Sequence, residues 1–427
     1  MIPIQSMLRC ALVGLLLANP LAAISAELPR AKPEQVGLSS QRLDLITETL
    51  KADIAAKKIP GAVLLIARRG KVAYFESVGK LDTATDTAMS KDGIFRIYSM
   101  SKPITTVAAM MLVEDGKMKL EDPVAMYLPE FEKMTVGVEK PDASGNPALE
   151  TVPARRAITV QDLMRHTSGI TYGFFGPGLV KKSYNDANLM ADNPDNAEFS
   201  RRIAKQPLMY QPGTTWDYSY STDILGRVVE AVSGKSLFAF EKERLLGPLG
   251  MTDTSFYVTD SVKQKRIAEP FGTDRNFGVG SNFGDPRIAQ KLESGGGGMV
   301  STATDYAQFL QMLLNGGSLN GKRYLSPNTL RFMTSDHSNA GAGVTQGPLY
   351  LPGAGYGFGL GFAVRRNAGE AAYPAEAGEY YWGGAGGTYM WVDPKAEMIV
   401  VFMMQSPKQR VHYRGLLRNM IYAAIVK

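Results

Sequence analysis

The sequence is poor in the residue types that most metal sites and many catalytic sites need. Its 427 residues include one cysteine, Cys10, and three histidines, His166, His337 and His412. No two histidines have the H-E-x-x-H or H-x-H spacing that would place two imidazoles on one metal ion. The G-x-S-x-G motif of the α/β-hydrolase nucleophile is also missing. We therefore expect neither a metal nor a cofactor, and a nucleophile in some other setting.

The first 26 residues have the pattern of a secretory signal. They contain one charge, Arg9, followed by an apolar run and the small residues Ser25 and Ala26. The alternative is a membrane anchor, but Asn19 and Pro20 interrupt the run well short of the ~20 apolar residues that a span needs. We expect cleavage near Ala26, a periplasmic or secreted location, and no stable membrane anchor after cleavage.

Composition narrows the remaining classes of function. Because Cys10 lies within the signal segment, the mature chain carries no thiol, which excludes disulfides, a cysteine nucleophile and thiolate zinc sites. The formal net charge of +6 is mild and comes without long Lys/Arg runs. We therefore expect no nucleic-acid partner.

Hydrophobic periodicity at both ends of the chain predicts a sheet flanked by helices. Ser40 to Ala56 has apolar residues at helical spacing, and a second amphipathic helix closes the chain at Leu416 to Ile425. The expected strands are Ala62 to Ala67 and Val72 to Val78, which form a hairpin, and then Gly357 to Val364, Gly387 to Val392 and Met398 to Met403.

The middle of the chain has a different character, with helical segments and long Gly/Pro-containing loops. We therefore predict an α+β protein with a discontinuous sheet domain, residues 27–95 and 290–427, and an inserted, mostly helical domain, residues 96–289. The catalytic cleft is expected where the two meet.

The first chemical motif is S-x-x-K at Ser99 to Lys102, at the start of a helical pattern. Residues i and i+3 share a helix face, so the hydroxyl and the ammonium can meet. The same spacing recurs at Ser77 to Lys80, but in an expected strand, where residues three apart point to opposite faces. Taken alone, the spacing favours Ser99 as a helix cap and Lys102 as a solvated charge.

Two further elements change that balance. Tyr218 and Tyr220 follow a Pro-Gly turn and precede a helix; a phenol is a weak base unless a nearby cation stabilises its anion, and Lys102 is the expected cation. The segment Tyr380 to Thr388 contains W-G-G at Trp382 to Gly384, expected at the start of a strand. Glycines there let backbone N–H groups approach a substrate, as an oxyanion hole requires. The alternatives are packing tyrosines and a plain Gly-rich turn.

In this order, the motifs resemble the serine β-lactamase and penicillin-binding-protein superfamily, most closely class C β-lactamases and family VIII carboxylesterases. The likeness covers Leu28 to Lys427 and implies a β-lactamase/transpeptidase-like fold. Its landmarks are Arg96 to Thr105, Leu163 to Gly169, Pro212 to Ser221, Ser294 to Leu314 and Trp382 to Gly384.

The resemblance implies a role for each matching residue. Ser99 matches the nucleophile, and Lys102 matches the lysine that polarises it. Tyr218 matches the first position of Y-x-N and would be the general base, although which group takes the proton is disputed in this superfamily. The backbone N–H groups of Ser99 and Ala385 would bind the oxyanion. His166 resembles a structural residue beside the cleft.

Two departures from the superfamily pattern bear on the substrate. Trp382-Gly383-Gly384 stands where β-lactamases and peptidases usually have Lys-Thr-Gly or His-Thr-Gly, so an indole replaces a cation suited to a substrate carboxylate. Tyr220 stands where Y-x-N has Asn. Family VIII esterases carry the same W-G-G, so the resemblance implies small or medium uncharged esters.

The aromatic residues Tyr172 and Phe174 complete the expected substrate-binding set with Trp382, Gly383, Gly384 and Tyr220. We interpret Tyr172 to Gly178 as a mobile lid over an apolar acyl pocket; a disordered surface loop is the alternative. The sequence thus predicts an exported, carboxylesterase-like serine hydrolase acting on a small-molecule ester or amide. The alternatives are a β-lactamase or D-amino-acid-specific peptidase or amidase, and a penicillin-recognising module without turnover.

Overall fold

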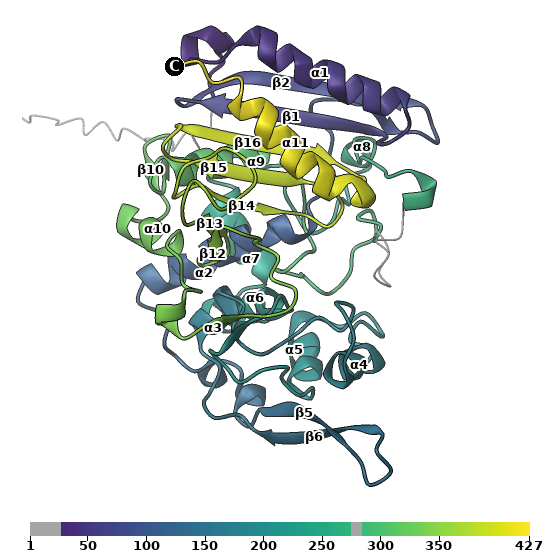
Figure 1. The fold of residues 1–427 in the computed structure, drawn as a ribbon, viewed down its shortest axis with the longest axis vertical. Helices are drawn as coiled ribbons and strands as arrows, with labels where there is room; N and C mark the ends of the chain where they lie inside the picture. Colours follow the sequence, from purple (N-terminus) through teal and green to yellow (C-terminus); the bar gives the residue numbers. More distant parts are fainter. Residues whose placement is uncertain (1–26, 275–283) are drawn as a thin grey trace, which may run out of the picture.

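The computed structural model describes residues 27–274 and 284–427, so the predicted signal segment lies outside the described residues. Its main feature is an eight-stranded sheet in the order β12-β13-β14-β15-β16-β1-β2-β3 (Figure 1). All of its pairings are antiparallel. The strands are β1 (Gly61–Arg68), β2 (Lys71–Asp82), β3 (Thr87–Ala88), β12 (Tyr356–Phe358), β13 (Ala363–Arg365), β14 (Tyr380–Gly383), β15 (Tyr389–Asp393) and β16 (Met398–Met404). Because β1 pairs with β16, both ends of the chain build one sheet, as predicted.

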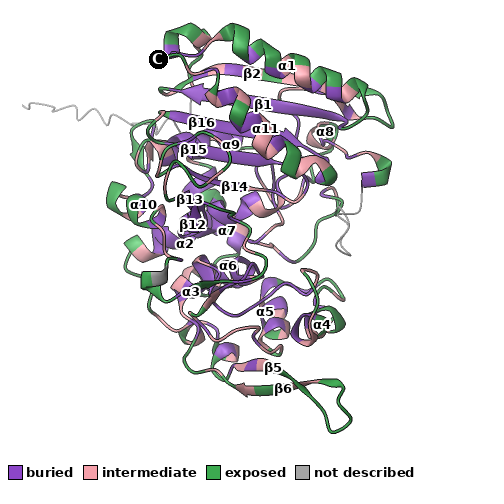
Figure 2. Ribbon diagram, in the orientation of Figure 1, coloured by how far each residue is buried: buried purple, intermediate pink, exposed green. Residues whose placement is uncertain are grey.

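Helices cover both faces of this sheet. Helices α1 (Ser40–Ala55) and α11 (Arg410–Tyr422) pack side by side on one face, and α9 (Ala303–Leu314) packs against β1, β15 and β16 from the other (Figure 1). Strands β1 and β16 are consequently buried along their whole length (Figure 2). Continuous apolar runs, rather than alternating ones, are what a strand covered on both faces requires.

Local patterns located most elements of this domain. Helix α1 begins after Ser39, whose Oγ accepts a hydrogen bond from the Arg42 N–H at 3.3 Å. The prediction of one strand over Gly357 to Val364 was wrong, because β12 and β13 are two strands joined by a reversal. Gly361 makes the reversal possible with φ of 87°, and a Cβ there would lie 2.8 Å from Thr106 Oγ1. The reversal therefore depends on a contact between distant segments.

The inserted region is rich in helices, in agreement with its predicted mostly helical character. They are α2 (Ser101–Glu114), α3 (Val160–Met164), α4 (Leu179–Asp186), α5 (Asn196–Ala204), α6 (Ser221–Ser233) and α7 (Leu237–Glu241). The sequence did not predict the hairpin of β5 (Thr135–Pro141) and β6 (Pro147–Pro153), which projects from the end of the molecule farthest from α1 (Figure 1). Only Val136 of its strand residues is buried, and Pro141, Pro147 and Pro153 bound the strands, so the hairpin gives a weaker strand signal than the core strands do. The division at residues 95 and 290 stays a prediction.

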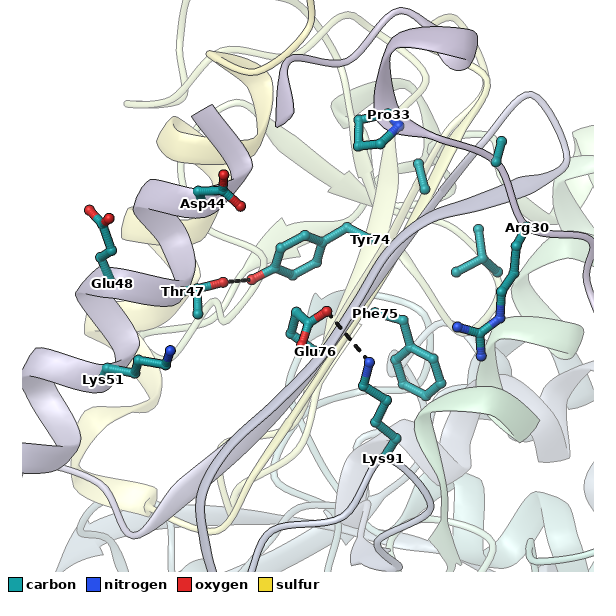
Figure 3. A pocket seen from close by; sticks show the side chains of 13 residues that line it. Arg30, Pro33, Asp44, Thr47, Glu48, Lys51, Tyr74, Phe75, Glu76 and Lys91 are labelled. Carbon is teal, nitrogen blue, oxygen red and sulfur yellow. Dashed lines mark hydrogen bonds and ion pairs between the residues drawn. The ribbon is translucent and has the colours of Figure 1, made fainter. Parts of the chain in front are cut away.

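A groove of about 580 Å³ lies between α1 and β2 (Figure 3). Thr47 and Tyr74 share a 2.7 Å hydrogen bond there, and Lys91 pairs with Glu76 at 3.4 Å. Strands β15, β16 and β1 separate β2 from β14, so at ~4.8 Å per strand the groove lies on the order of 20 Å from the W-G-G motif. It is therefore distinct from the candidate active site.

Candidate active site

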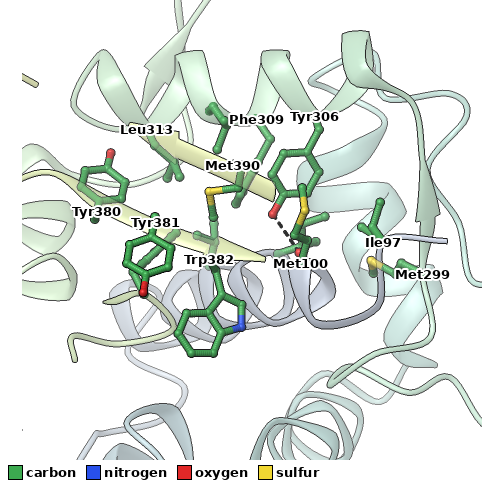
Figure 4. Close-up of a cluster of buried hydrophobic side chains, with 14 of the residues drawn as sticks. Ile97, Met100, Met299, Tyr306, Phe309, Leu313, Tyr380, Tyr381, Trp382 and Met390 are labelled. Carbon is green, nitrogen blue, oxygen red and sulfur yellow. Dashed lines mark hydrogen bonds between the residues drawn. The ribbon is translucent and has the colours of Figure 1, made fainter. Parts of the chain in front are cut away.

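Ser99 lies in a short 3-10 turn, η2 (Tyr98–Met100), that leads directly into α2. Tyr98 has φ of 44°, a left-handed conformation that costs a non-glycine residue roughly 1–3 kcal/mol. Two hydrogen bonds hold the turn: Ser101 Oγ donates to the Tyr98 carbonyl at 2.7 Å, and the Tyr306 hydroxyl donates to the Met100 carbonyl at 2.8 Å (Figure 4). The packed surroundings thus fix the backbone on both sides of Ser99.

Lys102 is buried one helical turn beyond Ser99. Its Nζ lies 3.5 Å from Ser99 Oγ, 3.1 Å from the Tyr172 hydroxyl and 2.5 Å from the Gly296 carbonyl oxygen. An ammonium has three donors, so neutral oxygen atoms use all of them. One of these oxygens belongs to the predicted nucleophile.

Asp223 holds the segment 294–296, whose last carbonyl binds Lys102. Its Oδ1 accepts hydrogen bonds from Ser294 Oγ at 2.5 Å and from the Gly296 N–H at 3.1 Å. Burial raises the pKa of the Asp223 carboxyl, while the positive charge of Lys102 opposes that rise. A Cβ on Gly296 would lie 2.2 Å from Asp223 Oδ2, so only glycine fits there. Asp223 therefore sets the position of the carbonyl that holds the ammonium.

Tyr218 lies against both Lys102 and Trp382. Lys102 Nζ is 4.5 Å from the centroid of the Tyr218 ring, and Trp382 Nε1 donates a 3.2 Å hydrogen bond to the Tyr218 hydroxyl. The phenol of Tyr218 therefore has a cation at its ring and an N–H donor at its oxygen. Four predicted site residues from three separate segments, Ser99, Lys102, Tyr218 and Trp382, thus meet in one place.

His166 packs behind Tyr218, with ring centroids 4.8 Å apart. Its Nδ1 lies 3.3 Å from Ser219 Oγ. Complete burial lowers the pKa of the His166 imidazole well below 6.5, and the nearby Lys102 charge lowers it further. The ring is therefore neutral at pH 7 and serves as a packing surface for the Tyr218 ring.

The W-G-G motif lies at the end of strand β14, which the sequence did not predict, and the glycine-rich turn after it leads into the expected next strand, β15. Trp382 and Gly383 are the last residues of β14, and Gly384 begins the turn to β15. A Cβ on Gly384 would lie 2.5 Å from the carbonyl oxygen of Ile97, which also accepts a 3.3 Å hydrogen bond from Thr388 Oγ1. The turn that carries Ala385 therefore packs against the residues just before Ser99.

Tyr172 has a closer relation to the site than the sequence indicated. Its hydroxyl binds Lys102. Its ring stacks on that of Phe174 with centroids 4.8 Å apart, and it packs edge-to-face with the Tyr220 ring with centroids 4.3 Å apart. Burial raises the pKa of the phenols of Tyr172 and Tyr220, so both stay protonated at neutral pH. The sequence analysis placed Tyr172 only in a substrate lid. Its contact with Lys102, like that of Gly296 with Lys102 and that of Asp223 with Gly296, had no local signal.

Comparison with known proteins places this site in a family. A family model described as Beta-lactamase matches residues 46–423. The chain belongs to the Beta-lactamase family. A protein of Mycobacterium tuberculosis is 36% identical over 360 residues, covering 81% of this chain and 86% of the relative. Esterase EstB of Burkholderia gladioli is 30% identical over 415 residues, covering 90% of this chain and 95% of the esterase.

Solved structures agree with this assignment. The structure of EstCE1, a hydrolase with promiscuous acyltransferase activity, superposes with a TM-score of 0.74 at 29% identity and covers 90% of this chain and 99% of EstCE1. The β-lactamase/transpeptidase-like fold and the family resemblance predicted from the sequence are thus confirmed. The protein is a serine hydrolase related to β-lactamases and similar to esterases.

Proposed function

We propose that the protein is an exported carboxylesterase that cleaves small or medium uncharged esters through an acyl-enzyme on Ser99. The observation that carries the proposal is the convergence of a half-buried Ser99 Oγ with the buried Lys102 Nζ and Tyr218–Trp382 pair in one cluster. A hydroxyl, an ammonium and a phenol supply a nucleophile and the acid–base groups that ester cleavage needs.

In acylation, Ser99 Oγ attacks the ester carbonyl carbon and its proton passes to the Lys102–Tyr218 pair. The carbonyl oxygen takes the negative charge, facing the backbone N–H groups of Ser99 and Ala385. Tyr218 then returns a proton to the leaving alkoxide, which departs as an alcohol. In deacylation, a water molecule attacks the carbonyl carbon of the acyl-enzyme and passes a proton to the same Lys102–Tyr218 pair. The pair returns a proton to Ser99 Oγ as the bond to the acyl group breaks, and the carboxylic acid is released.

The walls of the site support an uncharged substrate. Trp382 presents an indole where a carboxylate-binding enzyme of this kind would present a cation, and Tyr172, Phe174 and Tyr220 add three more aromatic rings. Nearby, Leu349 and Leu351 are exposed leucines, and Leu349 comes within 3.7 Å of a Cβ built on Gly176 in the Tyr172–Gly178 segment. Apolar groups exposed around a site favour an apolar ligand.

Export is proposed from the N-terminal pattern alone, which lies outside the described residues. Across residues 27–274 and 284–427, none of the helices has the length and apolar character needed to cross a bilayer. Processing near Ala26 is tested by expressing the full chain and sequencing the N-terminus of the protein recovered from the periplasm and the medium. Recovery of uncleaved protein from the cytoplasm alone would contradict export.

The decisive experiment for the reaction is Ser99→Ala. We expect this variant to lose hydrolysis of p-nitrophenyl butyrate and labelling by a fluorophosphonate probe, while keeping the thermal unfolding transition of the wild type. Ser77→Ala, in the second S-x-x-K sequence, is the matched control and should keep both. Full activity of Ser99→Ala would overturn the proposal.

Substrate class is tested by comparing rates on a short ester, nitrocefin and a D-Ala-D-Ala peptide. Preference for nitrocefin or the peptide would favour a β-lactamase or peptidase and would show that Trp382 does not set the specificity. Failure of the probe to label Ser99 would favour a binding module without turnover.

A second candidate reaction is acyl transfer to an alcohol. It is favoured by the similarity to EstCE1, whose description includes promiscuous acyltransferase activity. In this reaction an alcohol replaces water in attacking the acyl-enzyme, and the same residues handle its proton. It is tested by adding benzyl alcohol to a p-nitrophenyl butyrate reaction and measuring benzyl butyrate against butyrate.

A further inference from the structure

The segment Tyr172–Gly178, here called the aromatic loop, has two different sides. One side faces the candidate active site: Tyr172 binds Lys102 at 3.1 Å, and the ring of Phe175 lies 6.2 Å from that of Tyr218. Phe174 and Phe175 are only partly buried. Aromatic side chains of the loop therefore line the approach to Lys102 and Tyr218.

Helix α4 holds the loop from the other side through two side chains one turn apart. Lys181 Nζ donates to the Phe175 carbonyl, and Asn185 Nδ2 donates to the Gly173 carbonyl at 3.0 Å. Lys181 is buried, although it is a lysine, and its charge acts on the buried Asp217. Together these two contacts act as a latch between α4 and the backbone of the loop.

An open hollow of about 430 Å³ lies on the latch side of the loop. Its walls include Gly173, Gly176 and Gly178 of the loop, Asn185 of α4, and Glu139 and Pro147 of the β5–β6 hairpin. Gly176 and Gly178 have φ of 82° and 125°, which gives the loop glycine positions able to change conformation. Across the loop tip lies Leu349. The loop thus lies between its aromatic contacts at the candidate active site and the open hollow of about 430 Å³.

From this arrangement we infer that the aromatic loop determines which acyl chains the enzyme accepts. The inference rests on the proposed function. With the latch closed, Phe174 and Phe175 limit the site to short acyl groups. When the loop tip moves away from Leu349 into the hollow, a longer apolar acyl chain passes between the loop tip and Leu349. Lys181 and Asn185 are positioning residues that set the balance between these two forms.

The first test weakens the latch with Lys181→Met. Loss of a hydrogen bond to a charged group is expected to raise kcat/KM for p-nitrophenyl octanoate relative to p-nitrophenyl acetate by about tenfold. Lys140→Met is the matched control, because Lys140 follows Glu139 on the hairpin strand β5 but is not among the residues that line the hollow, and its side chain is 55% exposed and pairs with Glu150. This control should keep the wild-type ratio. If Lys181→Met fails to fold, Asn185→Ala tests the second latch contact and should raise the ratio about threefold.

The second test fills the hollow instead, with Pro147→Trp on the exposed hairpin strand. This variant should lower the octanoate-to-acetate ratio by about tenfold, while kcat/KM for the acetate ester stays within about twofold of wild type. Opposite changes in the two variants would support a loop that moves into the hollow. If Lys181 had a purely structural role, Lys181→Met would lower the octanoate and acetate rates together. If the loop did not move into the hollow, Pro147→Trp would leave the octanoate-to-acetate ratio unchanged.

The inference and the proposed function fail in distinguishable ways. Wild-type enzyme that hydrolyses neither ester would overturn the proposed function. Normal acetate hydrolysis with an unchanged octanoate-to-acetate ratio in folded Lys181→Met, Asn185→Ala and Pro147→Trp would overturn the inference and leave the proposed function in place. Folding of each variant is checked by its thermal unfolding transition.

Discussion

The chain contains the S-x-x-K spacing twice, and the two copies have opposite surroundings. In β2, Ser77 and Lys80 lie on an outer strand, and the Lys80 ammonium pairs with Asp86 at 2.8 Å, with 38% of its side chain exposed. At η2 and α2, Lys102 is 1% exposed and binds Ser99, Tyr172 and Gly296. The same four-residue spacing therefore gives a solvated ion pair in one place and a buried cluster in the other.

The difference comes from backbone geometry and burial. In a strand, side chains three apart point to opposite faces, so Ser77 and Lys80 cannot meet, whereas in the first turn of a helix they share a face. Burial then changes what the lysine can do. An exposed ammonium is solvated and its ion pair is screened, but a buried one acts strongly on the few groups that touch it. The predictions below exchange or remove the features that distinguish the two copies.

The largest effect is expected for Lys102→Met. Removing the ammonium takes away the group beside Ser99 Oγ and the cation over the Tyr218 ring, so kcat/KM on p-nitrophenyl butyrate should fall by about a thousandfold. Steady-state kinetics on the purified variant measures this loss, and circular dichroism checks its fold. An activity above about one tenth of wild type would contradict the role of Lys102.

Tyr218→Phe is expected to lower kcat by about a hundredfold, because the proposed general base is lost while the ring and its packing stay. The hydroxyl that accepts the Trp382 N–H is lost with it. The control is Tyr74→Phe on β2, which removes a hydroxyl bonded to Thr47 near the other S-x-x-K copy. If both variants had equal activity, Tyr218 would not be the base.

Asp223→Asn should lower kcat/KM about tenfold and change its dependence on pH. Burial raises the pKa of Asp223 above 3.8, so acidification protonates this carboxyl at a higher pH than an ordinary aspartate and weakens its hold on Ser294 and Gly296. Wild-type activity should therefore decline on the acid side in part through Asp223, and the variant should lack that component. Because the folded-state pKa is raised, protonation also stabilises the wild-type fold as pH falls, and this gain should disappear in the variant.

A pH–rate profile and denaturant unfolding at several pH values measure the two effects separately. Asp86→Asn is the control, since Asp86 is the acidic partner of the other lysine. It should leave both profiles unchanged. An acid limb identical in Asp223→Asn and wild type would show that Asp223 does not act on Lys102.

The smallest effect is expected for Lys80→Met. Its pair with Asp86 is largely exposed, and exposed pairs contribute about 0–1 kcal/mol to the free energy of unfolding. Urea unfolding should show a change within that range, and hydrolysis of p-nitrophenyl butyrate should be the same as wild type. A large loss of activity in Lys80→Met would mean that this lysine also contributes to catalysis, contrary to what its exposed ion pair indicates.

Sequence reasoning located elements whose signal is local. The apolar spacing of α1, the β1–β2 hairpin and the start of α2 after Ser99 all follow from residues close together in the chain. It failed at the β12–β13 reversal and at the end of β14. Both depend on where glycines meet distant atoms, Thr106 Oγ1 for Gly361 and the Ile97 carbonyl for Gly384.

The amino-acid sequence by itself determined the family, the α+β class and the residue types available for chemistry, because motifs in a fixed order and local periodicity carry that information. Only the tertiary structure decided what surrounds Lys102. Its partners Tyr172 and Gly296 lie 70 and 194 residues away, and the Trp382 N–H reaches Tyr218 across 164 residues. A backbone carbonyl is present in every residue and gives no sequence signal, so the folded chain alone selects the one that binds the ammonium.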